Sequence, residues 1–325
     1  MGLTNEIKLD VSSQCISGYE WPSELLSYTN SLKSLEGKLD YGEFFKITKS
    51  FKNSIPVIVT LVSKEYLSVA KVWLSKLKRT LVEQYIIIAV DEESKTFLDS
   101  SNAQSCRVWL GEFNQYENPF LSKTGFTEKG LSITALKFPI VKELLLLNFD
   151  VILMDVDALL LTNLPIDFFL TVDVAFQRVF YFPEPIAKVW NFAACSGFVW
   201  FKSNSNTIEL LNNSIVKQFK VYSDQIALNL ALWESNIKWE YTQNKKDDYH
   251  TFIESERKDF FIQNHKNKIH GVSDKNGLKV CALPTDSFWR NDFVPIEISN
   301  VIVFHPNSPK IEEGKIEIYK NYKLL

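Results

Sequence analysis

The apolar run over residues 149–161 is the feature that most constrains the fold of this chain. Only Asp150, Asp155 and Asp157 interrupt it. A segment this apolar is typical of a strand buried on both faces of a sheet, as in α/β proteins. Open α/β sheets place their ligands at the carboxyl ends of the strands. Asp155 and Asp157, at the end of the expected strand, therefore mark a candidate ligand site.

The i and i+2 spacing of these two carboxylates indicates a divalent-metal site. Two acids this close repel each other unless a cation lies between them. Mg²⁺ and Mn²⁺ prefer oxygen ligands and usually take substrate phosphates as further ligands. We therefore expect Asp155 and Asp157 to hold Mn²⁺ or Mg²⁺ for a phosphate-bearing substrate. The pattern Asp-x-Asp is common, and the alternative is a solvated loop or a helix N-cap.

Composition limits the class of protein. The chain has 325 residues, 46% of them hydrophobic, which suits one large α/β domain or two smaller ones. The net charge is −3 and no basic stripe occurs, so we expect no nucleic-acid partner. The four cysteines are far apart, which favours free thiols in a reducing compartment. With no apolar signal-peptide region and no stretch long enough to span a bilayer, we expect a cytoplasmic protein.

The pattern of strands and helices predicts an α/β fold. Residues 1–50 are polar and are expected to form an N-terminal helical extension, and 51–325 a single domain. Val57–Val62, Tyr66–Leu77 and Tyr85–Val90 read as strand, helix and strand, hence a parallel pair with a right-handed crossover. Further strands are expected at 151–154, 172–176, 197–201, 279–283 and 301–304, and helices at 132–147, 205–219 and 223–233. The expectation is a mixed, mainly parallel central sheet flanked by helices.

Six motifs follow one another along the chain: Val59–Val62, Thr134–Lys137, Leu153–Asp157, Cys195–Phe198, Ser223–Asn229 and Phe304–Asn307. Their order resembles that of the GT-A glycosyltransferases, in particular the nucleotide-diphospho-sugar transferases that include family 77, with family 8 as relatives. The resemblance covers residues from about 55 to 325. It implies a Rossmann-like GT-A fold and metal-dependent transfer of a sugar from a UDP-sugar to a hydroxyl of a glycan or protein-linked acceptor, with retention of anomeric configuration.

The resemblance also assigns ligand-binding residues. It makes Asp155, Asp157 and His305 the metal ligands. It places the nucleotide-sugar donor on Thr60, Leu61, Lys137, Asp155, Val156, Ser196, Gly197, Asn307, Lys310 and Lys315. The spacing of Lys310 and Lys315 departs from the family pattern, and Cys195 replaces the usual Asn, which puts any donor-sugar contact from that side chain in doubt.

The resemblance assigns catalysis to Asp224 and Gln225. Asp224 would orient the donor-sugar hydroxyls, and Gln225 would lie near the anomeric carbon. Retention could follow from a one-step reaction or from a double displacement with Asp224 as nucleophile. The alternative for Asp224 is a helix N-cap, because Ser223-Asp224 precedes an apolar helix. Trp190, Phe288 and Trp289 lie where loops could stack on a sugar face.

Three other interpretations stay open. A haloacid-dehalogenase-type phosphatase also carries Asp-x-Asp after an apolar strand, and Asp247-Asp248 could supply its later acidic pair, although Leu159 stands where that class has Thr or Ser. A sugar-phosphate nucleotidyltransferase would need a Gly-rich loop in place of residues 63–65. A catalytically inactive UDP-binding protein of the same fold is consistent with Cys195.

Overall fold

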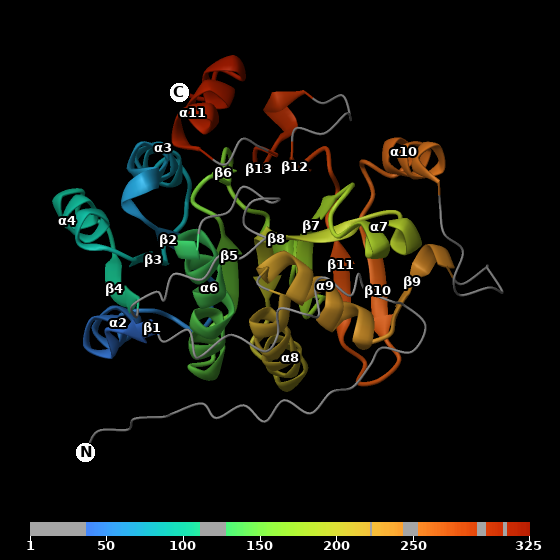
Figure 1. Ribbon diagram of the computed structural model, residues 1–325, viewed down its shortest axis with the longest axis horizontal. Helices are drawn as coiled ribbons and strands as arrows, with labels where there is room; N and C mark the ends of the chain where they lie inside the picture. The colour runs from blue at the N-terminus through green and yellow to red at the C-terminus, as the bar shows by residue number, and fades with distance from the viewer. Residues whose placement is uncertain (1–36, 111–127, 222, 243–252, 291–296, 308–310) are drawn as a thin grey trace.

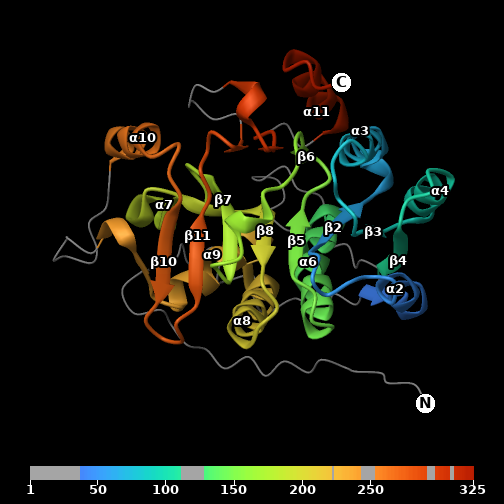
Figure 2. The ribbon, with the colours of Figure 1, turned by 180° about the vertical axis from the view of Figure 1, so that it is seen from behind.

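The computed structural model describes residues 37–110, 128–221, 223–242, 253–290, 297–307 and 311–325. Its centre is a ten-stranded mixed sheet with the order β1-β4-β3-β2-β5-β8-β7-β11-β10-β9, seen from both sides in Figures 1 and 2. A small second sheet has the order β12-β13-β6. Helices surround the large sheet, so the predicted α/β fold, a mixed central sheet flanked by helices, is confirmed.

The strands are β1 (Gly37–Leu39), β2 (Val57–Val62), β3 (Tyr85–Ala89), β4 (Ser105–Leu110), β5 (Val151–Met154), β6 (Leu159–Leu160), β7 (Val174–Val179), β8 (Ala193–Phe201), β9 (Ile237–Trp239), β10 (Ile269–Ser273), β11 (Lys279–Ala282), β12 (Phe288–Trp289) and β13 (Val303–Phe304). The α-helices are α2 (Tyr41–Thr48), α3 (Leu67–Leu77), α4 (Glu92–Ser100), α6 (Glu128–Leu146), α7 (Glu184–Trp190), α8 (Ser205–Val221), α9 (Asp224–Glu234), α10 (Glu254–Gln263) and α11 (Glu312–Asn321).

The central strands are buried on both faces. Every residue of β2, β5 and β8 is buried. Alternate residues of a strand point to opposite faces, and accordingly Val59 belongs to one apolar cluster and Ile58 to another. Helices α6, α8 and α9 pack together on one face. Helices α3 and α11 and the small sheet lie together at the upper end of the molecule in Figure 1.

The parallel part of the sheet is the run β4-β3-β2-β5, together with the pair β7-β11. Strand β8 lies between β5 and β7 and is antiparallel to both. Strands β5 and β7 therefore run in the same direction, and their carboxyl ends lie at the same edge of the sheet. This edge carries the candidate site.

The N-terminal extension is only partly described. Residues 1–36, including the helix expected there, lie outside the described residues. Residues 37–48 form β1 and α2, and β1 pairs with β4 at the edge of the sheet. The boundary at residue 50 stays a prediction. Within the described part of the chain, no helix is long and apolar enough to cross a membrane.

Candidate functional site

Strand pairing brings His305 to the Asp-x-Asp segment. β5 ends at Met154, Asp155 and Asp157 follow, and β6 begins at Leu159. β13 pairs antiparallel with β6, with Phe304 opposite Leu159. His305 directly follows β13, and its amide donates to the Trp289 carbonyl at 2.8 Å. The small sheet thus places a residue almost 150 positions away in sequence beside Asp157.

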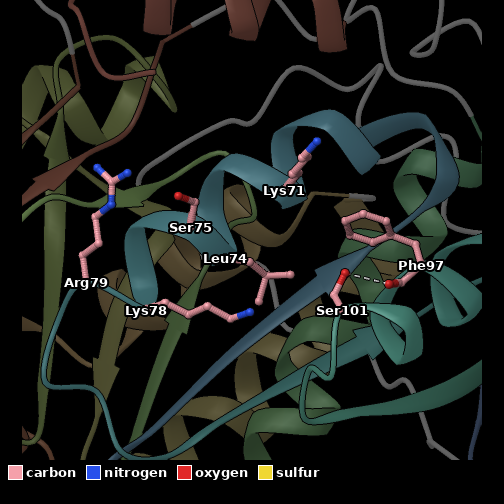
Figure 3. Close-up of a pocket in the computed structure, with 7 residues that line it drawn as sticks. All are labelled: Lys71, Leu74, Ser75, Lys78, Arg79, Phe97 and Ser101. Carbon is pink, nitrogen blue, oxygen red and sulfur yellow. Dashed lines mark hydrogen bonds between the residues drawn. The ribbon is translucent and has the colours of Figure 1, made fainter.

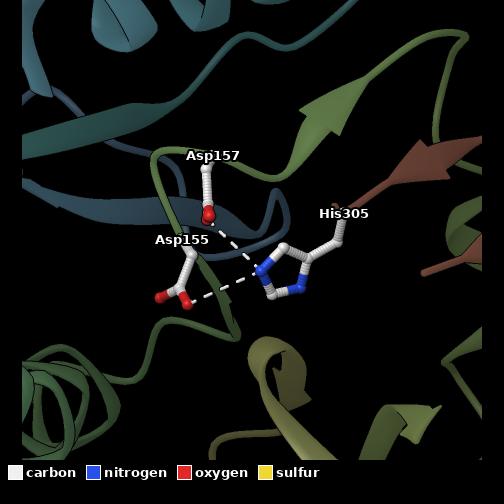
Figure 4. Close-up of side chains that lie close together, drawn as sticks. All are labelled: Asp155, Asp157 and His305. Atoms are coloured by element: carbon white, nitrogen blue, oxygen red, sulfur yellow. Dashed lines mark ion pairs between the residues drawn. The ribbon is translucent and has the colours of Figure 1, made fainter. Parts of the chain in front are cut away.

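Asp155, Asp157 and His305 form a cluster with the geometry of a metal site. His305 Nε2 lies 3.2 Å from Asp157 Oδ1 and 3.9 Å from Asp155 Oδ2. One donor atom of each residue lies within 4.8 Å of the others. Figure 4 shows both carboxylates directed toward the imidazole. Two carboxylate oxygens and one imidazole nitrogen suit a borderline-hard divalent ion such as Mn²⁺ and are compatible with Mg²⁺.

Two lysines bind the other oxygen of each carboxylate. Lys137 Nζ lies 2.6 Å from Asp155 Oδ1, and Lys315 Nζ lies 2.9 Å from Asp157 Oδ2. Each aspartate therefore gives one oxygen to a lysine and turns the other toward His305. The repulsion between the two acids is already relieved by these cations, so it does not by itself demand a metal ion. The lysines hold the free oxygens in a converging arrangement that a metal ion can use.

Lys137 links the cluster of Asp155, Asp157 and His305 to the predicted catalytic residues. Its ammonium also lies 2.7 Å from Asp224 Oδ2, and its side chain is buried. Burial lowers the pKa of Lys137, but the charges of Asp155 and Asp224 outweigh it and raise the pKa above its ordinary value. Asp224 Oδ1 accepts from the backbone amide of Gln225. Both carboxylate oxygens of Asp224 are thus engaged.

The N-cap of α9 is Ser223 and not Asp224. The Ser223 hydroxyl accepts from the Ile226 amide at 3.3 Å. Asp224 is the first helical residue, and its side chain turns to Lys137. Gln225 is partly exposed, and its Nε2 donates to the Phe182 carbonyl at 2.6 Å. At the start of the helix, Asp224 therefore contacts Lys137, whereas the Gln225 side chain contacts the segment after β7.

Gly197 is required by close packing at the cluster. A Cβ atom at this position would lie 2.1 Å from His305 Cε1 and 2.7 Å from Asp155 Oδ2. The Gly197 carbonyl accepts from the Asp155 amide at 2.8 Å. Glycine in the interior of a strand often marks such a close approach. Gly197 thus allows β8 to pass beside two of the three candidate metal ligands.

The opposite side of His305 is held by three further side chains. Its Nδ1 lies 3.2 Å from Gln177 Oε1, 3.2 Å from Arg290 Nη1 and 3.6 Å from Cys195 Sγ. Nε2 is therefore the nitrogen that faces the carboxylates. Burial raises the pKa of Cys195, but the charges of Arg290 and His305 outweigh it and lower that pKa below its ordinary value. Residues that hold the second nitrogen of a ligand histidine fix the orientation of its ring.

Helix α11 closes the site from the C-terminal side. Lys315 Nζ, besides binding Asp157, donates to the Pro306 carbonyl at 3.0 Å. The Tyr319 hydroxyl donates to the Asp157 carbonyl at 2.8 Å. Glu312 accepts from the Ser68 amide in the first turn of α3, where the helix dipole favours a carboxylate. One helix thus fixes Asp157 through both its side chain and its backbone.

The other predicted donor-binding residues differ in accessibility. Thr60 is fully buried in β2 and Leu61 is 7% exposed, whereas Val156 is partly exposed. Ser196 is buried beside Gly197. Asn307 is exposed and accepts from Arg290 Nη2 at 3.2 Å. Lys310 lies outside the described residues. The roles of these residues as donor contacts stay predictions.

Sequence reasoning missed four residues at the site: Tyr66, Gln177, Arg290 and Tyr319. Burial and, to a smaller extent, the charges of Asp157 and Asp155 raise the pKa of Tyr66 above its ordinary value. Tyr66 and Gln177 lie just after β2 and near the end of β7, so the rule that ligands bind at the carboxyl ends of strands could have found them. Arg290 follows the two-residue strand β12, which has no clear sequence signal.

The aromatic residues expected to stack on a sugar are buried. Trp190 is 5% exposed, Trp289 is 4% exposed and Phe288 is fully buried. Phe288 packs against Phe169 and Phe198, and Trp190 against Trp239. The hypothesis that these three stack on a ligand is therefore wrong, because they form part of the core.

A separate hollow of about 360 Å³ lies between α3 and α4 (Figure 3). It is lined by Lys71, Leu74, Ser75, Lys78, Arg79, Phe97 and Ser101. None of these is a predicted site residue, and no carboxylate lines the hollow. The hollow is therefore separate from the cluster around Asp155 and Asp157.

Comparison with known proteins assigns the family. A sequence model of the nucleotide-diphospho-sugar transferases matches residues 80–309, well over half of the chain. The chain belongs to this family. The prediction of a GT-A nucleotide-diphospho-sugar transferase is thus confirmed, and this nucleotide-diphospho-sugar transferase is a glycosyltransferase. The family match overturns the interpretation as a haloacid-dehalogenase-type phosphatase.

A solved structure of the galactosyltransferase LgtC in complex with donor and acceptor sugar analogs is also similar. The match covers 82% of this chain and 95% of that chain, at 12% sequence identity and a TM-score of 0.44. A likeness at this TM-score supports no argument about substrate. No curated protein sequence matches this chain significantly.

Proposed function

We propose that this transferase moves a sugar from a UDP-sugar to an acceptor hydroxyl with retention of anomeric configuration, using Mn²⁺ or Mg²⁺ held by Asp155, Asp157 and His305. The observation that carries this proposal is the convergence of two carboxylate oxygens and one imidazole nitrogen at the carboxyl end of β5. When bound, the ion acts as a Lewis acid that stabilises charge on a departing diphosphate.

The residues of the chain support a one-step reaction. The acceptor oxygen forms its bond to the anomeric carbon as the bond from that carbon to the diphosphate breaks. The electron pair leaves with the diphosphate, and the hydroxyl proton passes to the departing phosphate oxygen. Asp224, whose two oxygens are engaged by Lys137 and the Gln225 amide, is better placed to orient sugar hydroxyls than to act as a nucleophile. Gln225 carries a neutral carbonyl oxygen that suits a cationic centre.

The experiment is a panel of UDP-sugars with Mn²⁺ or Mg²⁺, scoring release of UDP in the absence of acceptor. We expect slow hydrolysis of one donor, its loss in excess chelator and its loss in Asp157→Ala. Glu93→Ala, an exposed residue of α4, is the matched control and should keep full activity. Full activity in chelator would contradict metal dependence. UDP binding without turnover of any donor would instead favour the inactive UDP-binding protein.

A further inference from the structure

The segment that follows β7 runs along the edge of the candidate site. Just before this segment, near the end of β7, Gln177 contacts His305. Near the end of the segment, the Phe182 carbonyl accepts from the Gln225 side chain. A continuous line of contacts therefore leads from Asp155 through Lys137 and Asp224 to Gln225 and then to Phe182. The residues just before Phe182 lie beyond the carboxyl end of β7, at the same edge of the sheet as Asp155.

This segment exposes two neighbouring aromatic side chains. Tyr181 is 51% exposed and Phe182 is 46% exposed. Of all the described aromatic residues, the only others that are exposed are Tyr41 and Phe45 on α2, at the far edge of the sheet. Most aromatic side chains here are buried in the core, so a pair left open beside the site needs a reason.

The backbone that carries the pair is held firmly. The Phe180 carbonyl accepts from Arg257 Nη2, and the Arg257 guanidinium lies 4.4 Å from the centre of the Phe180 ring. The Phe180 ring in turn packs edge-on against the Tyr181 ring, with 4.5 Å between the two ring centres. Arg257 comes from α10 and Gln225 from α9. Two helices thus fix the segment on either side of the exposed rings.

We propose that Tyr181 and Phe182 form the binding platform for the acceptor, and that the acceptor is a glycan whose sugar ring packs on these aromatic faces. This inference rests on the proposed function and names the acceptor class for the same site. A sugar ring offers C–H groups on one face and hydroxyls at its edge. A flat aromatic side chain covers the apolar face, while the hydroxyls stay available for polar contacts. Tyr181 adds a hydroxyl for such a contact.

The position of the pair suits an acceptor and not the donor. Asp224, next to Gln225, contacts Lys137, which in turn contacts Asp155, and the diphosphate and the donor sugar would bind in that direction. The Phe182 carbonyl accepts from the side-chain amide of Gln225, so the segment that carries the two rings contacts the site through Gln225. A hydroxyl of a sugar held on the platform would therefore approach the anomeric carbon from the Gln225 side. An acceptor of another class, such as a serine side chain, has no ring face to cover the two aromatics.

The test measures two reactions of the full chain with the same donor. One is hydrolysis of the UDP-sugar without acceptor. The other is transfer to a panel of methyl glycosides of glucose, galactose and xylose, with N-acetylserinamide as the amino-acid probe. We expect Tyr181→Ala and Phe182→Ala each to raise the KM for the methyl glycoside by roughly 3- to 10-fold, and hydrolysis to stay unchanged. Phe182→Trp should keep the KM low, and Phe182→Leu should not.

The control is Phe45→Ala, which removes an exposed aromatic side chain at the far edge of the sheet. It should change neither reaction. Equal KM values for the wild type and the two Ala variants would overturn the platform. A wild type that hydrolyses the donor and transfers sugar to N-acetylserinamide, but to none of the methyl glycosides, would also overturn it. Absence of both reactions in the wild type would instead contradict the proposed function, so the two failures are distinguishable.

Discussion

At the scale of single residues, the site depends on how each aspartate divides its two oxygens. One oxygen of Asp155 binds Lys137 and one oxygen of Asp157 binds Lys315, while the remaining pair turns to His305. The sequence predicted Asp155 and Asp157 from their position after a buried strand. It could not predict this division, because the lysines come from distant helices. Because the two lysines neutralise the carboxylates, the closeness of Asp155 and Asp157 does not by itself require a metal ion in the folded protein.

The close packing at Gly197 gives a prediction about metal binding. Gly197→Ala would place a methyl group 2.1 Å from His305 Cε1, so the imidazole or β8 must shift. A displacement near 1 Å at a site of this kind can cost roughly 100-fold in activity. We expect a 10- to 100-fold rise in the Mn²⁺ concentration for half-maximal UDP-sugar hydrolysis. Gly42→Ala on α2 is the control. An unchanged metal titration for Gly197→Ala would refute the close packing described.

His305 gives a prediction about pH. Burial and Arg290 lower its pKa, but Asp157 and Cys195 outweigh them, so the pKa lies above the ordinary value of 6.5. A raised folded-state pKa means that the bound proton stabilises the fold below pH 6.5, and that this contribution is lost as the pH rises through the folded pKa. A metal ligand must be the neutral imidazole, so each pH unit below that pKa weakens metal binding by about tenfold.

The measurement is thermal unfolding with and without Mn²⁺ at pH 6 and pH 8. We expect the rise in Tm caused by Mn²⁺ to be larger at pH 8. In His305→Ala the rise should be small at both values. A rise that is larger at pH 6 would contradict the assignment of His305 as a ligand.

At the scale of elements, the strands and helices around the site differed in how far the sequence predicted them. The strand expected over 57–62 is β2. The helix expected over 66–77 is α3, which begins one residue later, at Leu67. These have long β-branched or amphipathic patterns. The helix α10 was missed because half of its residues are charged, and β12 because two residues carry no periodicity. Strand β13 lies within the strand expected over 301–304 but is only two residues long. His305 owes its place to those short strands.

The start of α9 separates a capping role from a catalytic one. Ser223 is the N-cap, so Ser223→Ala should lower the free energy of unfolding by about 1 kcal/mol and leave turnover nearly unchanged. Asp224→Asn removes the negative charge that pairs with Lys137 and that would accept hydrogen bonds from the donor sugar. We expect turnover to fall roughly 10- to 100-fold with UDP affinity nearly intact. Steady-state kinetics and chemical denaturation of both variants test this. A silent Asp224→Asn variant would remove Asp224 from the catalytic residues.

At the scale of the whole molecule, the fold collects the site from the entire described chain. Asp155 and Asp157 follow β5, Lys137 comes from α6, Asp224 begins α9, and His305 and Lys315 come from the C-terminal part. The Asp-x-Asp segment and the order of motifs were readable from the sequence. The convergence of the others depends on the antiparallel insertion of β8 between β5 and β7 and on the small sheet, which are long-range pairings with no local signal.

The most direct test of the central claim is a crystal structure with Mn²⁺ and UDP, using the anomalous signal of manganese to locate the ion. We predict one strong anomalous peak bound by Asp155, Asp157 and His305 Nε2, with the UDP phosphates completing its coordination. A peak at any other position, or UDP bound with no peak while Lys137 and Lys315 alone neutralise the carboxylates, would contradict the account.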